Sequence, residues 1–420
     1  MTQPLSLNIN SEIGELEGVI LHTPGAEVEN MTPGTAQRAL YSDILNLSIA
    51  QKEYAQLRGV LERYTRTYEV VDLLSGVLDN YRKRESLIGK ICIGEGAADY
   101  FDDLMEMPSV ELAKALIEGV PAKINSLTAY LNDEYYALYP LYNFYFTRDA
   151  SVTIGNNALI CRMANRVRMR ESLIMEAIFK GSSAFNCHII NAHDFHPGNG
   201  EIFMEGGDIL IARDDILLVG NGNRTSTQGI DLLIARLCKD NLEGRKHVIV
   251  QQLPHSPESF IHLDMVFTLL DRDKCMVFEP LILGNNQYRT VQITIENGKV
   301  AKIKSVSDIL SALKRLGMEL EPVFCGGVAD EWNQEREQWH SGANFFAMAP
   351  GKVLSYARNI HTLDELSKHG FEIIQAWDII ENRKDMKDYR KCVVTIDGSE
   401  LPRGGGGARC MTMPVSRKNL

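Results

Sequence analysis

The sequence lacks the features of a membrane protein or of a disulfide-rich secreted protein. No apolar run approaches the roughly 18 residues that a membrane span needs. The first residues, Met1–Leu5, have neither the basic region nor the apolar segment of a secretory signal peptide. No two of the eight cysteines form a CxxC pair, and they are scattered as Cys92, Cys161, Cys187, Cys238, Cys275, Cys325, Cys392 and Cys410. We therefore expect reduced cysteines and a cytoplasmic protein.

Positive charge is also scarce, because 44 Lys and Arg residues face 55 Asp and Glu residues, for a net charge of −11. This balance disfavours nucleic acid or an anionic membrane as a partner. It is compatible with a cationic small-molecule substrate. The apolar fraction of 45% and the charged fraction of 24% are those of a globular protein with a sizeable core.

One unusual stretch lies near the C-terminus, where four consecutive glycines, 404–407, are followed closely by Cys410. Each glycine loses more backbone entropy on folding than another residue would, so a run of four needs a reason. Such a run serves where the backbone bends sharply, approaches a ligand closely or moves as a gate. A cysteine delivered by this loop suggests a nucleophile. The alternative is a flexible tail with a bystander cysteine.

The N-terminal part of the chain mixes strand and helix patterns. We predict a short buried strand at Val19–Leu21, a helical stretch over about 35–64 and a second strand over 69–74. Strand patterns then disappear over 75–140, which we interpret as a helical insertion of several short helices. No catalytic motif falls inside this insertion.

From residue 141 onward one theme recurs: a short apolar strand, a tight polar turn, a second apolar strand and then a helix. Irregular spacing excludes a solenoid, and such repeats favour radial repetition around a central axis. A degenerate fifth copy lies near residue 20. We assign residues 1–74 and 141–420 to one catalytic α/β unit. The four clear hairpins span 151–161, 208–219, 265–278 and 344–356.

Ionisable residues precede three of these hairpins at the same position: Asp149, Glu205, and the pair His262 and Asp264. Each lies beside apolar sequence, where loss of water shifts a pKa. On an extended strand, His262 and Asp264 would point to the same side. If the repeats are radial, these residues meet near one axis, together with Cys410.

Each of these residues also has a purely structural interpretation. A lone aspartate at a strand start is commonly a turn residue, Glu205–Asp208 alone is commonly a turn, and a lone histidine is commonly a hydrogen-bonded core residue. The recurrence across three repeats, together with the glycine–cysteine loop, favours a site. The segment His193–His196 lacks further ligands at metal-binding spacing, so we interpret it as a loop and expect no metal.

Eight motifs occur in order along the chain. They are Ser11-Glu12-Ile13-Gly14, His22-Thr23-Pro24-Gly25, Phe146-Thr147-Arg148-Asp149, Glu205-Gly206-Gly207-Asp208, His262-Leu263-Asp264, Arg336-Glu337-Gln338-Trp339, Ala349-Pro350-Gly351 through Arg358-Asn359, and Gly404 through Pro414. Taken together, these motifs resemble the arginine deiminase family of the guanidino-group-modifying superfamily. The resemblance implies a five-bladed pseudo-symmetric α/β propeller with a helical insertion, and a homo-oligomer (dimer or tetramer). It implies hydrolysis of L-arginine to L-citrulline and ammonia without a metal or an organic cofactor.

The same resemblance implies a role for each catalytic residue. Asp149 and Asp264 would bind the N–H donors of the substrate guanidinium. Cys410 would attack the guanidinium carbon and form an S-alkylthiouronium intermediate. His262 would protonate the departing ammonia and then deprotonate water, while Glu205 would stabilise its imidazolium form.

Four further residues are implied for substrate binding: Asn143, Arg168, Arg224 and Asp208. The two arginines would pair with the carboxylate of the substrate, which agmatine lacks. One departure stands out, because many family members carry another substrate-binding arginine five residues before the cysteine, where this chain has Gly405. The group that completes the carboxylate clamp is therefore open.

Other functions remain open alternatives at this point. One is another enzyme of the superfamily, acting on agmatine or methylated arginine or transferring the amidino group. The other is a catalytically silent binding protein on the same fold.

Overall fold

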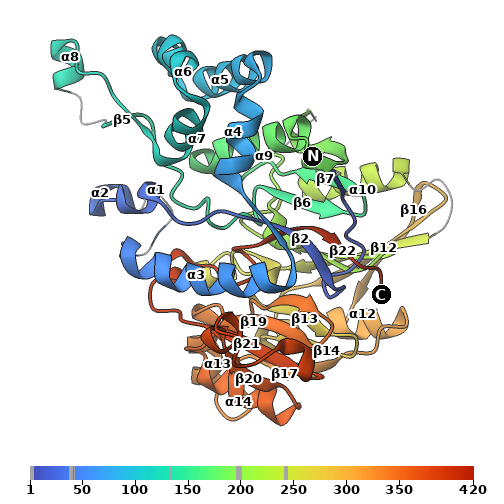
Figure 1. The fold of residues 1–420 in the computed structure, drawn as a ribbon. Coiled ribbons are helices and arrows are strands. Elements are labelled where there is room, and N and C mark those ends of the chain that lie inside the picture. The colour runs from blue at the N-terminus through green and yellow to red at the C-terminus, as the bar shows by residue number, and fades with distance from the viewer. Residues whose placement is uncertain (1–3, 37–40, 42, 132–134, 195–200, 241–244) are drawn as a thin grey trace.

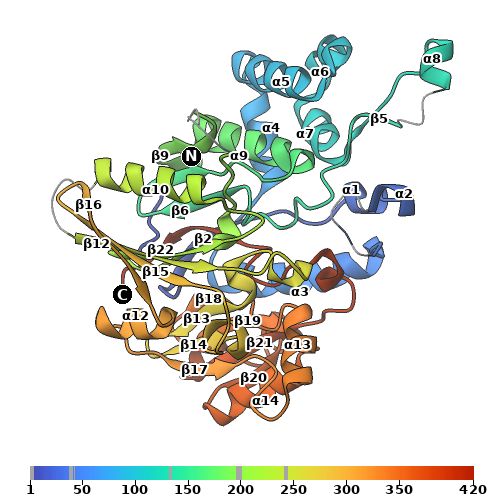
Figure 2. The ribbon, with the colours of Figure 1, turned by 180° about the vertical axis from the view of Figure 1, so that it is seen from behind.

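A computed structural model describes residues 4–36, 41, 43–131, 135–194, 201–240 and 245–420. Five sheets of three to five strands surround a central axis as blades, and helices lie outside them (Figures 1 and 2). The prediction of an α/β propeller is confirmed.

In each blade the second strand pairs antiparallel with one neighbour and parallel with the other. The antiparallel pairs are β6 (Ser151–Ile154) with β7 (Asn157–Ile160), β10 (Ile209–Arg213) with β11 (Ile216–Asn221), β13 (Phe267–Asp271) with β14 (Lys274–Val277), β18 (Phe346–Ala349) with β19 (Lys352–Tyr356), and β22 (Met413–Arg417) with β2 (Leu16–Leu21). The parallel neighbours are β9 (His188–Asn191), β12 (Arg245–Gln252), β17 (Glu321–Phe324), β21 (Cys392–Ile396) and β3 (Arg66–Glu69). All four predicted hairpins are confirmed.

Two blades and two small sheets carry the remaining strands. In the second blade a long hairpin extends the sheet beyond β12, and in the fourth blade one strand lies beyond β21. The strands are β15 (Thr290–Glu296), β16 (Lys299–Val306), β20 (Glu372–Gln375), β1 (Leu5–Ser6) paired with β8 (Phe185–Asn186), and β4 (Val120–Pro121) paired with β5 (Tyr136–Leu138).

The fifth blade joins both ends of the chain. The C-terminal strand β22 pairs with the N-terminal strand β2, with Val19 opposite Pro414 and Ile20 opposite Met413. The predicted strand near residue 20 is thus confirmed, but its antiparallel partner comes from the far end of the sequence.

The predicted helix over 35–64 is shorter than expected. Helix α3 (Leu47–Tyr64) begins after Asn46, whose side chain accepts a hydrogen bond from the N–H of Ile49. Its apolar face, which includes Tyr54 and Leu57, is fully buried against the blades. Part of the interval before it lies outside the described residues.

The strand predicted over 69–74 is wrong. Strand β3 ends at Glu69, and helix α4 (Val70–Leu78) follows directly. Val70, Leu74 and Val77 are buried at helical spacing, so the apolar run that resembles a strand is one face of a helix.

Helices α4 to α7 lie together at one end of the molecule (Figures 1 and 2). No helix among the described residues has both the length and the apolar character to cross a membrane. The remaining helices of four or more residues are α1 (Ala26–Glu29), α2 (Pro33–Ala36), α5 (Tyr81–Glu95), α6 (Phe101–Glu106), α7 (Ser109–Glu118), α8 (Leu127–Tyr130), α9 (Met169–Gly181), α10 (Thr227–Asp240), α11 (Glu279–Ile282), α12 (Ile309–Arg315), α13 (Glu331–Trp339), α14 (Ile360–Lys368) and α15 (Ala376–Ile380), with a four-residue 3₁₀ helix at Leu401–Gly404.

Candidate active site

The five predicted catalytic residues come together at the axis of the propeller. Asp149 precedes β6, Glu205 precedes β10, His262 and Asp264 precede β13, and Cys410 precedes β22. All five are almost completely buried. Because each blade presents the start of its first strand to the axis, residues far apart in the sequence become neighbours.

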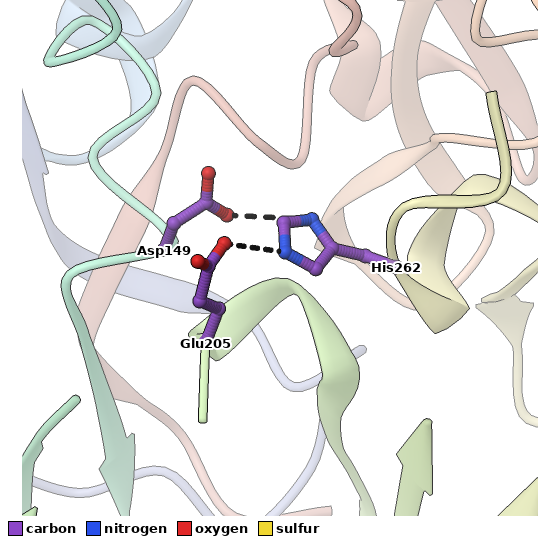
Figure 3. Close-up of side chains that lie close together, drawn as sticks. All are labelled: Asp149, Glu205 and His262. Carbon is purple, nitrogen blue, oxygen red and sulfur yellow. Dashed lines mark hydrogen bonds and ion pairs between the residues drawn. The ribbon is translucent and has the colours of Figure 1, made fainter. Parts of the chain in front are cut away.

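The imidazole ring of His262 faces two carboxylates, those of Asp149 and Glu205 (Figure 3). Its Nε2 is 2.9 Å from Oε2 of Glu205, and its Nδ1 is 3.7 Å from Oδ1 of Asp149. Burial alone would lower the pKa of His262, but the carboxylates of Asp149, Glu205 and Asp208 raise it to about 9. Burial likewise acts to raise the pKa of Glu205, but Arg224, His262 and Arg168 lower it to about 2. The pair is therefore an imidazolium and a carboxylate at neutral pH.

The atoms of Asp149 and His262 that face each other are not hydrogen-bonded. The 3.7 Å separation is too long for a hydrogen bond. Oδ1 of Asp149 and Nδ1 of His262 are both buried without a hydrogen-bond partner among the described residues. Buried polar atoms are normally satisfied, so these two atoms indicate a place for a polar ligand.

The thiol of Cys410 lies between a carboxylate and an amide. Its Sγ is 3.6 Å from Oδ2 of Asp264 and 3.2 Å from Nδ2 of Asn344, which donates to it. Burial, followed by the carboxylates of Asp264 and Asp149, raises the pKa of Cys410 well above its usual value. In this arrangement the group is a neutral thiol at neutral pH.

Asn344 occupies the same position before its hairpin as the ionisable residues of the other blades. It stands two residues before β18, at the place where the other blades carry their ionisable residues. Its Oδ1 accepts hydrogen bonds from the N–H groups of Arg409 and Cys410. Sequence reasoning identified the fourth hairpin but passed over Asn344, because an amide is not titratable.

Arg409 and Glu12 form a second buried group that sequence reasoning missed. The Arg409 guanidinium binds Glu12 at 3.0 and 3.1 Å and Oδ2 of Asp264 at 2.8 Å. Burial acts to raise the pKa of Glu12, but Arg409 and Arg148 lower it to about 2. Glu12 precedes β2, which is the second strand of the fifth blade, whereas the ionisable residues of the other blades precede the first strand. The repeat pattern therefore does not point to Glu12.

The glycine loop approaches its neighbours closely. A Cβ atom at Gly406 would lie 2.5 Å from Cε1 of Phe146, which is too short for a contact of a Cβ atom. Gly405 has a φ of +84°, which favours glycine, and an added Cβ there would meet no atom within 4 Å. The run therefore serves close packing at one position and a left-handed turn beside open space at another.

A cavity of about 280 Å³ leads to the thiol. Its lining includes the buried residues Asn143, Asp149, Arg168, His262 and Cys410, and the half-buried Arg224. Glu205, Asp208 and Asp264 are not among its lining residues.

Arg168 is already paired in this structure. It binds Glu171 through Nε and Nη2 at 2.8 to 3.2 Å, and its Nη1 is 2.7 Å from Oδ2 of Asp149. Arg224 is held less tightly than Arg168. Its one ion pair among the described residues joins its Nη1 to Oε1 of Glu205 at 3.6 Å. The two predicted carboxylate-binding arginines therefore differ in availability.

Asp208 lies behind the wall rather than in the cavity. It is completely buried, and its Oδ1 accepts a hydrogen bond of 2.9 Å from the N–H of Leu263. Burial raises its pKa to about 6. This hydrogen bond positions the segment that carries His262, and the role of Asp208 in substrate binding stays a prediction.

The local argument for His262 and Asp264 is wrong, although both residues are in the site. They do not lie on an extended strand, because Leu263–Met265 form a 3₁₀ turn. The turn aims His262 at Glu205 and Asp264 at Cys410. The two side chains thus flank the reaction centre from different directions.

Asp149, Glu205 and His262 also have the spacing of a metal site, since one ligand atom of each lies within 4.8 Å of the others. An imidazolium has no free lone pair for a metal, and the pKa of about 9 keeps His262 protonated at neutral pH. Arg168 adds a further cation, 2.7 Å from Asp149. The trio fits an acid–base group better than a metal centre. In the predicted loop His193–His196, residues 195 and 196 lie outside the described residues.

Solved structures share this propeller. An amidinotransferase from Microseira wollei, SxtG, superposes with a TM-score of 0.53 at 14% identity, covering 99% of this chain and 98% of that one. The N-terminal domain of ArgZ, covalently bound to a reaction intermediate, has a TM-score of 0.52 at 14% identity, covering 95% and 98%. At this identity the likeness defines the class by fold alone, as an α/β propeller.

Sequence comparison narrows this class. A family model described as arginine deiminase matches residues 37–417. The chain is 34% identical to an arginine deiminase from Bacillus cereus (strain ATCC 10987 / NRS 248) and 31% identical to one from Lactococcus lactis subsp. cremoris (strain MG1363), with 99% of both chains covered in each comparison. The chain belongs to the arginine deiminase family, as its motifs led us to expect.

Proposed function

We propose that this protein is a C–N hydrolase acting on a linear amidine, and that it converts L-arginine and water to L-citrulline and ammonia. The observation that carries the proposal is the convergence of a thiol, an imidazolium and two carboxylates at one end of a cavity. Cys410 and His262 line this cavity, and Asp264 lies 3.6 Å from the sulfur. Membership of the arginine deiminase family supports the choice of substrate.

The guanidinium group of the substrate fits the buried acceptors of the site. Oδ1 of Asp149 has no hydrogen-bond partner among the described residues and can accept an N–H of a planar cation. Asp264, beside the sulfur, can bind the other side of the same group. Held between the two carboxylates, the guanidinium carbon faces Cys410.

Substrate binding also activates the nucleophile. An unperturbed cysteine needs about 2 kcal/mol to ionise at pH 7, and the buried Cys410 needs more. A bound guanidinium places a positive charge beside the sulfur and offsets the repulsion from Asp149 and Asp264. The thiolate therefore forms mainly when the substrate is present, which protects the free enzyme from side reactions.

The first half of the reaction releases ammonia. The Cys410 thiolate attacks the guanidinium carbon, so that a C–S bond forms and a tetrahedral adduct results. The C–N bond to the terminal nitrogen then breaks while His262 donates a proton to that nitrogen. Ammonia leaves, and an S-alkylthiouronium remains on Cys410.

The second half consumes water. His262, now neutral, removes a proton from a water molecule whose oxygen attacks the thiouronium carbon. The C–S bond breaks, the leaving sulfur takes up the proton of the adduct's hydroxyl group and becomes the Cys410 thiol again, and the product is the ureido group of L-citrulline. Glu205, 2.9 Å from Nε2, stabilises the imidazolium in both halves. The proton that the Cys410 thiol loses on ionisation passes to solvent, where it balances the conversion of ammonia to ammonium.

A citrulline assay tests the proposal. We expect the wild-type protein to form citrulline and ammonia in equal amounts from L-arginine, and Cys410→Ala and His262→Ala to lose more than 99% of this activity. Cys187→Ala, which changes a cysteine outside the cavity lining, is the matched control and should retain full activity. Full ammonia release by Cys410→Ala would refute the assignment of the nucleophile.

The homo-oligomeric state implied by the resemblance stays a prediction. Light scattering coupled to size-exclusion chromatography would give the mass directly, and the monomer mass of 47.1 kDa would contradict it.

A further inference from the structure

One sequence motif, Arg336–Trp339, takes no part in the proposed mechanism. It forms the last residues of helix α13. Trp339 lines the cavity, whereas Gln338 does not. The side chain of Gln338 is almost completely buried, so its amide points into the protein. Buried amides are normally hydrogen-bonded, and the partners of this one lead back to the active site.

The Gln338 amide brackets His262. Its Nε2 donates to the carbonyl oxygen of Ser259 at 2.7 Å and to that of Met265 at 3.2 Å. These two carbonyls stand three residues before and three residues after His262. Both hydrogens of one amide are thus used to hold the two ends of the segment that carries the histidine.

The second half of this segment has other anchors as well. The N–H of Leu263 donates to Oδ1 of Asp208 at 2.9 Å. The carbonyl oxygen of Asp264 accepts a hydrogen bond from Nδ2 of Asn344 at 3.1 Å, and Nη1 of Arg409 binds the Asp264 carboxylate at 2.8 Å. Asp264 is therefore held from several sides.

The first half depends on Gln338. Over residues 256–262, the hydrogen bond from Gln338 to Ser259 is the only one among the described residues that joins a backbone group to a distant part of the chain. The His262 side chain adds its own contact, between Nε2 and Oε2 of Glu205 at 2.9 Å. Without the Gln338 amide, the backbone before His262 would be free to shift and would take the imidazole with it.

We propose that Gln338 is a positioning residue for His262. It holds the segment 259–265 so that the imidazolium stays against Glu205 and faces the cavity, where the proposed mechanism needs it to give and take protons. This role rests on the proposed function. Gln338 acts only through His262, because it does not line the cavity itself.

Gln334 offers a matched control on the same helix. It lies four residues before Gln338 and is buried to a similar degree, with 3% of its surface exposed against 1%. Its Nε2 also donates twice, to the carbonyl oxygen of Gly327 at 2.7 Å and to Oε2 of Glu279 at 3.3 Å, and none of these three residues lines the cavity. Methionine at either position replaces a buried amide with an apolar side chain of similar length. Both variants lose two hydrogen bonds, but only Gln338→Met loses those around His262.

The first measurement separates turnover from binding. The kcat of citrulline formation is measured in the active enzyme, and the Kd of L-arginine by calorimetry in the Cys410→Ala background. We expect Gln338→Met to lower kcat about tenfold or more, because a small displacement of an acid–base group is costly. It should change Kd by less than about threefold, because Asp264 keeps its own anchors. Gln334→Met should change both constants by less than about twofold.

The pKa of His262 reports how firmly its ring is held against Glu205. Burial lowers this pKa, and the surrounding carboxylates raise it to about 9. Glu205 is the carboxylate in hydrogen-bond contact with the ring, at 2.9 Å. The other charged groups around the pair of His262 and Glu205 are two carboxylates and two arginines, namely Asp149, Asp208, Arg168 and Arg224.

The second measurement uses this pKa and does not depend on turnover. The ring protons of His262 are titrated by NMR in the Cys410→Ala background and are assigned by their absence when His262→Ala is added. A loosened segment weakens the contact with Glu205, so the pKa should fall by about half a unit or more in Gln338→Met. It should stay unchanged in Gln334→Met, which a general loss of stability alone would not explain.

Gln338→Asn guards against a methionine variant that fails to fold. It keeps a buried amide but shortens the side chain by one methylene group, about 1.5 Å, so that the amide no longer reaches both carbonyls. We expect kcat and the pKa of His262 to fall as in Gln338→Met but by less. A folded Gln338→Asn protein with the wild-type kcat and pKa would overturn the positioning role.

Three results with the methionine variants would also overturn this role: a kcat of Gln338→Met within about twofold of the wild type, a lower kcat with an unchanged pKa of His262, or equal losses in Gln334→Met. The two proposals fail separately. A fall of the pKa in Gln338→Met, combined with no turnover by the wild type, would overturn the hydrolase function alone. Turnover by the wild type, combined with no fall of the pKa, would overturn the positioning role alone.

Discussion

The ion pair between His262 and Glu205 leads to a quantitative prediction about the pKa of His262 and the pH dependence of activity. Glu205→Gln keeps the shape of the side chain and removes the charge 2.9 Å from Nε2 of His262. A charge-assisted hydrogen bond is worth about 1–1.5 kcal/mol more than a neutral one, which corresponds to about one pKa unit. The pKa of His262 should therefore fall from about 9 to about 8.

The sign of this effect follows from which form of His262 is needed. The proposed mechanism begins with the imidazolium, so kcat/KM should fall as the pH rises through the pKa of His262. A carboxylate favours the imidazolium, and its removal moves this alkaline limb to lower pH. The same linkage means that the folded state gains stability from protonated His262 below pH 6.5 and loses it as the pH rises through about 9.

The assay is citrulline formation from L-arginine at subsaturating concentration between pH 6 and pH 10. Glu337→Gln is a suitable control, because Glu337 is buried and accepts hydrogen bonds from the N–H groups of His361 and Thr362, outside the site. It should lower stability without moving the limb. A limb that stays at pH 9 in Glu205→Gln, or that moves upward, would refute the assignment of His262 and Glu205.

Two further predictions concern the groups that hold the thiol. Arg409→Met leaves the carboxylates of Glu12 and Asp264 buried and unpaired, so the free energy of unfolding should fall by about 3–5 kcal/mol in urea denaturation; a loss below about 1 kcal/mol would contradict this account of the network. Asn344→Asp keeps the acceptor for the N–H groups of Arg409 and Cys410 but replaces the donor 3.2 Å from the sulfur with a carboxylate oxygen. We expect kcat to fall about tenfold or more, as a thiol pKa raised by one unit requires, and an unchanged kcat would argue against any role of Asn344 in activating the thiol.

The repeat of short hairpins is strong enough in the sequence to predict the propeller. Each hairpin pairs residues that are close along the chain, so the pattern of apolar runs and turns is local. The fifth blade is different, because β2 finds its antiparallel partner in β22 at the other end of the chain. No local pattern can reveal such a pair.

Local reasoning also confuses two kinds of apolar run. Residues 70–74 contain four apolar residues out of five, which fits a buried strand as well as a helix. The buried positions Val70, Leu74 and Val77 decide for the helix, because they recur at three- and four-residue spacing. Only the packing shows which of the two patterns applies.

The site residues were predictable where a titratable residue stands just before the first strand of a blade. Asp149, Glu205, His262 and Asp264 share a position in the repeat and meet at the axis. Pairing between side chains was not predictable, because Arg168 binds Asp149 and its sequence neighbours do not indicate this pair. Asp208 likewise shares a motif with Glu205 but supports the backbone of Leu263.

The pairing of β2 with β22 has a consequence for when the enzyme becomes competent. Cys410 stands three residues before β22, so the sulfur reaches the axis only after the two ends of the chain have docked. A polypeptide whose other four blades are complete still has no nucleophile beside Asp264. Pairing of β2 with β22 therefore both closes the propeller and completes the active site. Local separation of these two strands would abolish activity while the other four blades stay folded.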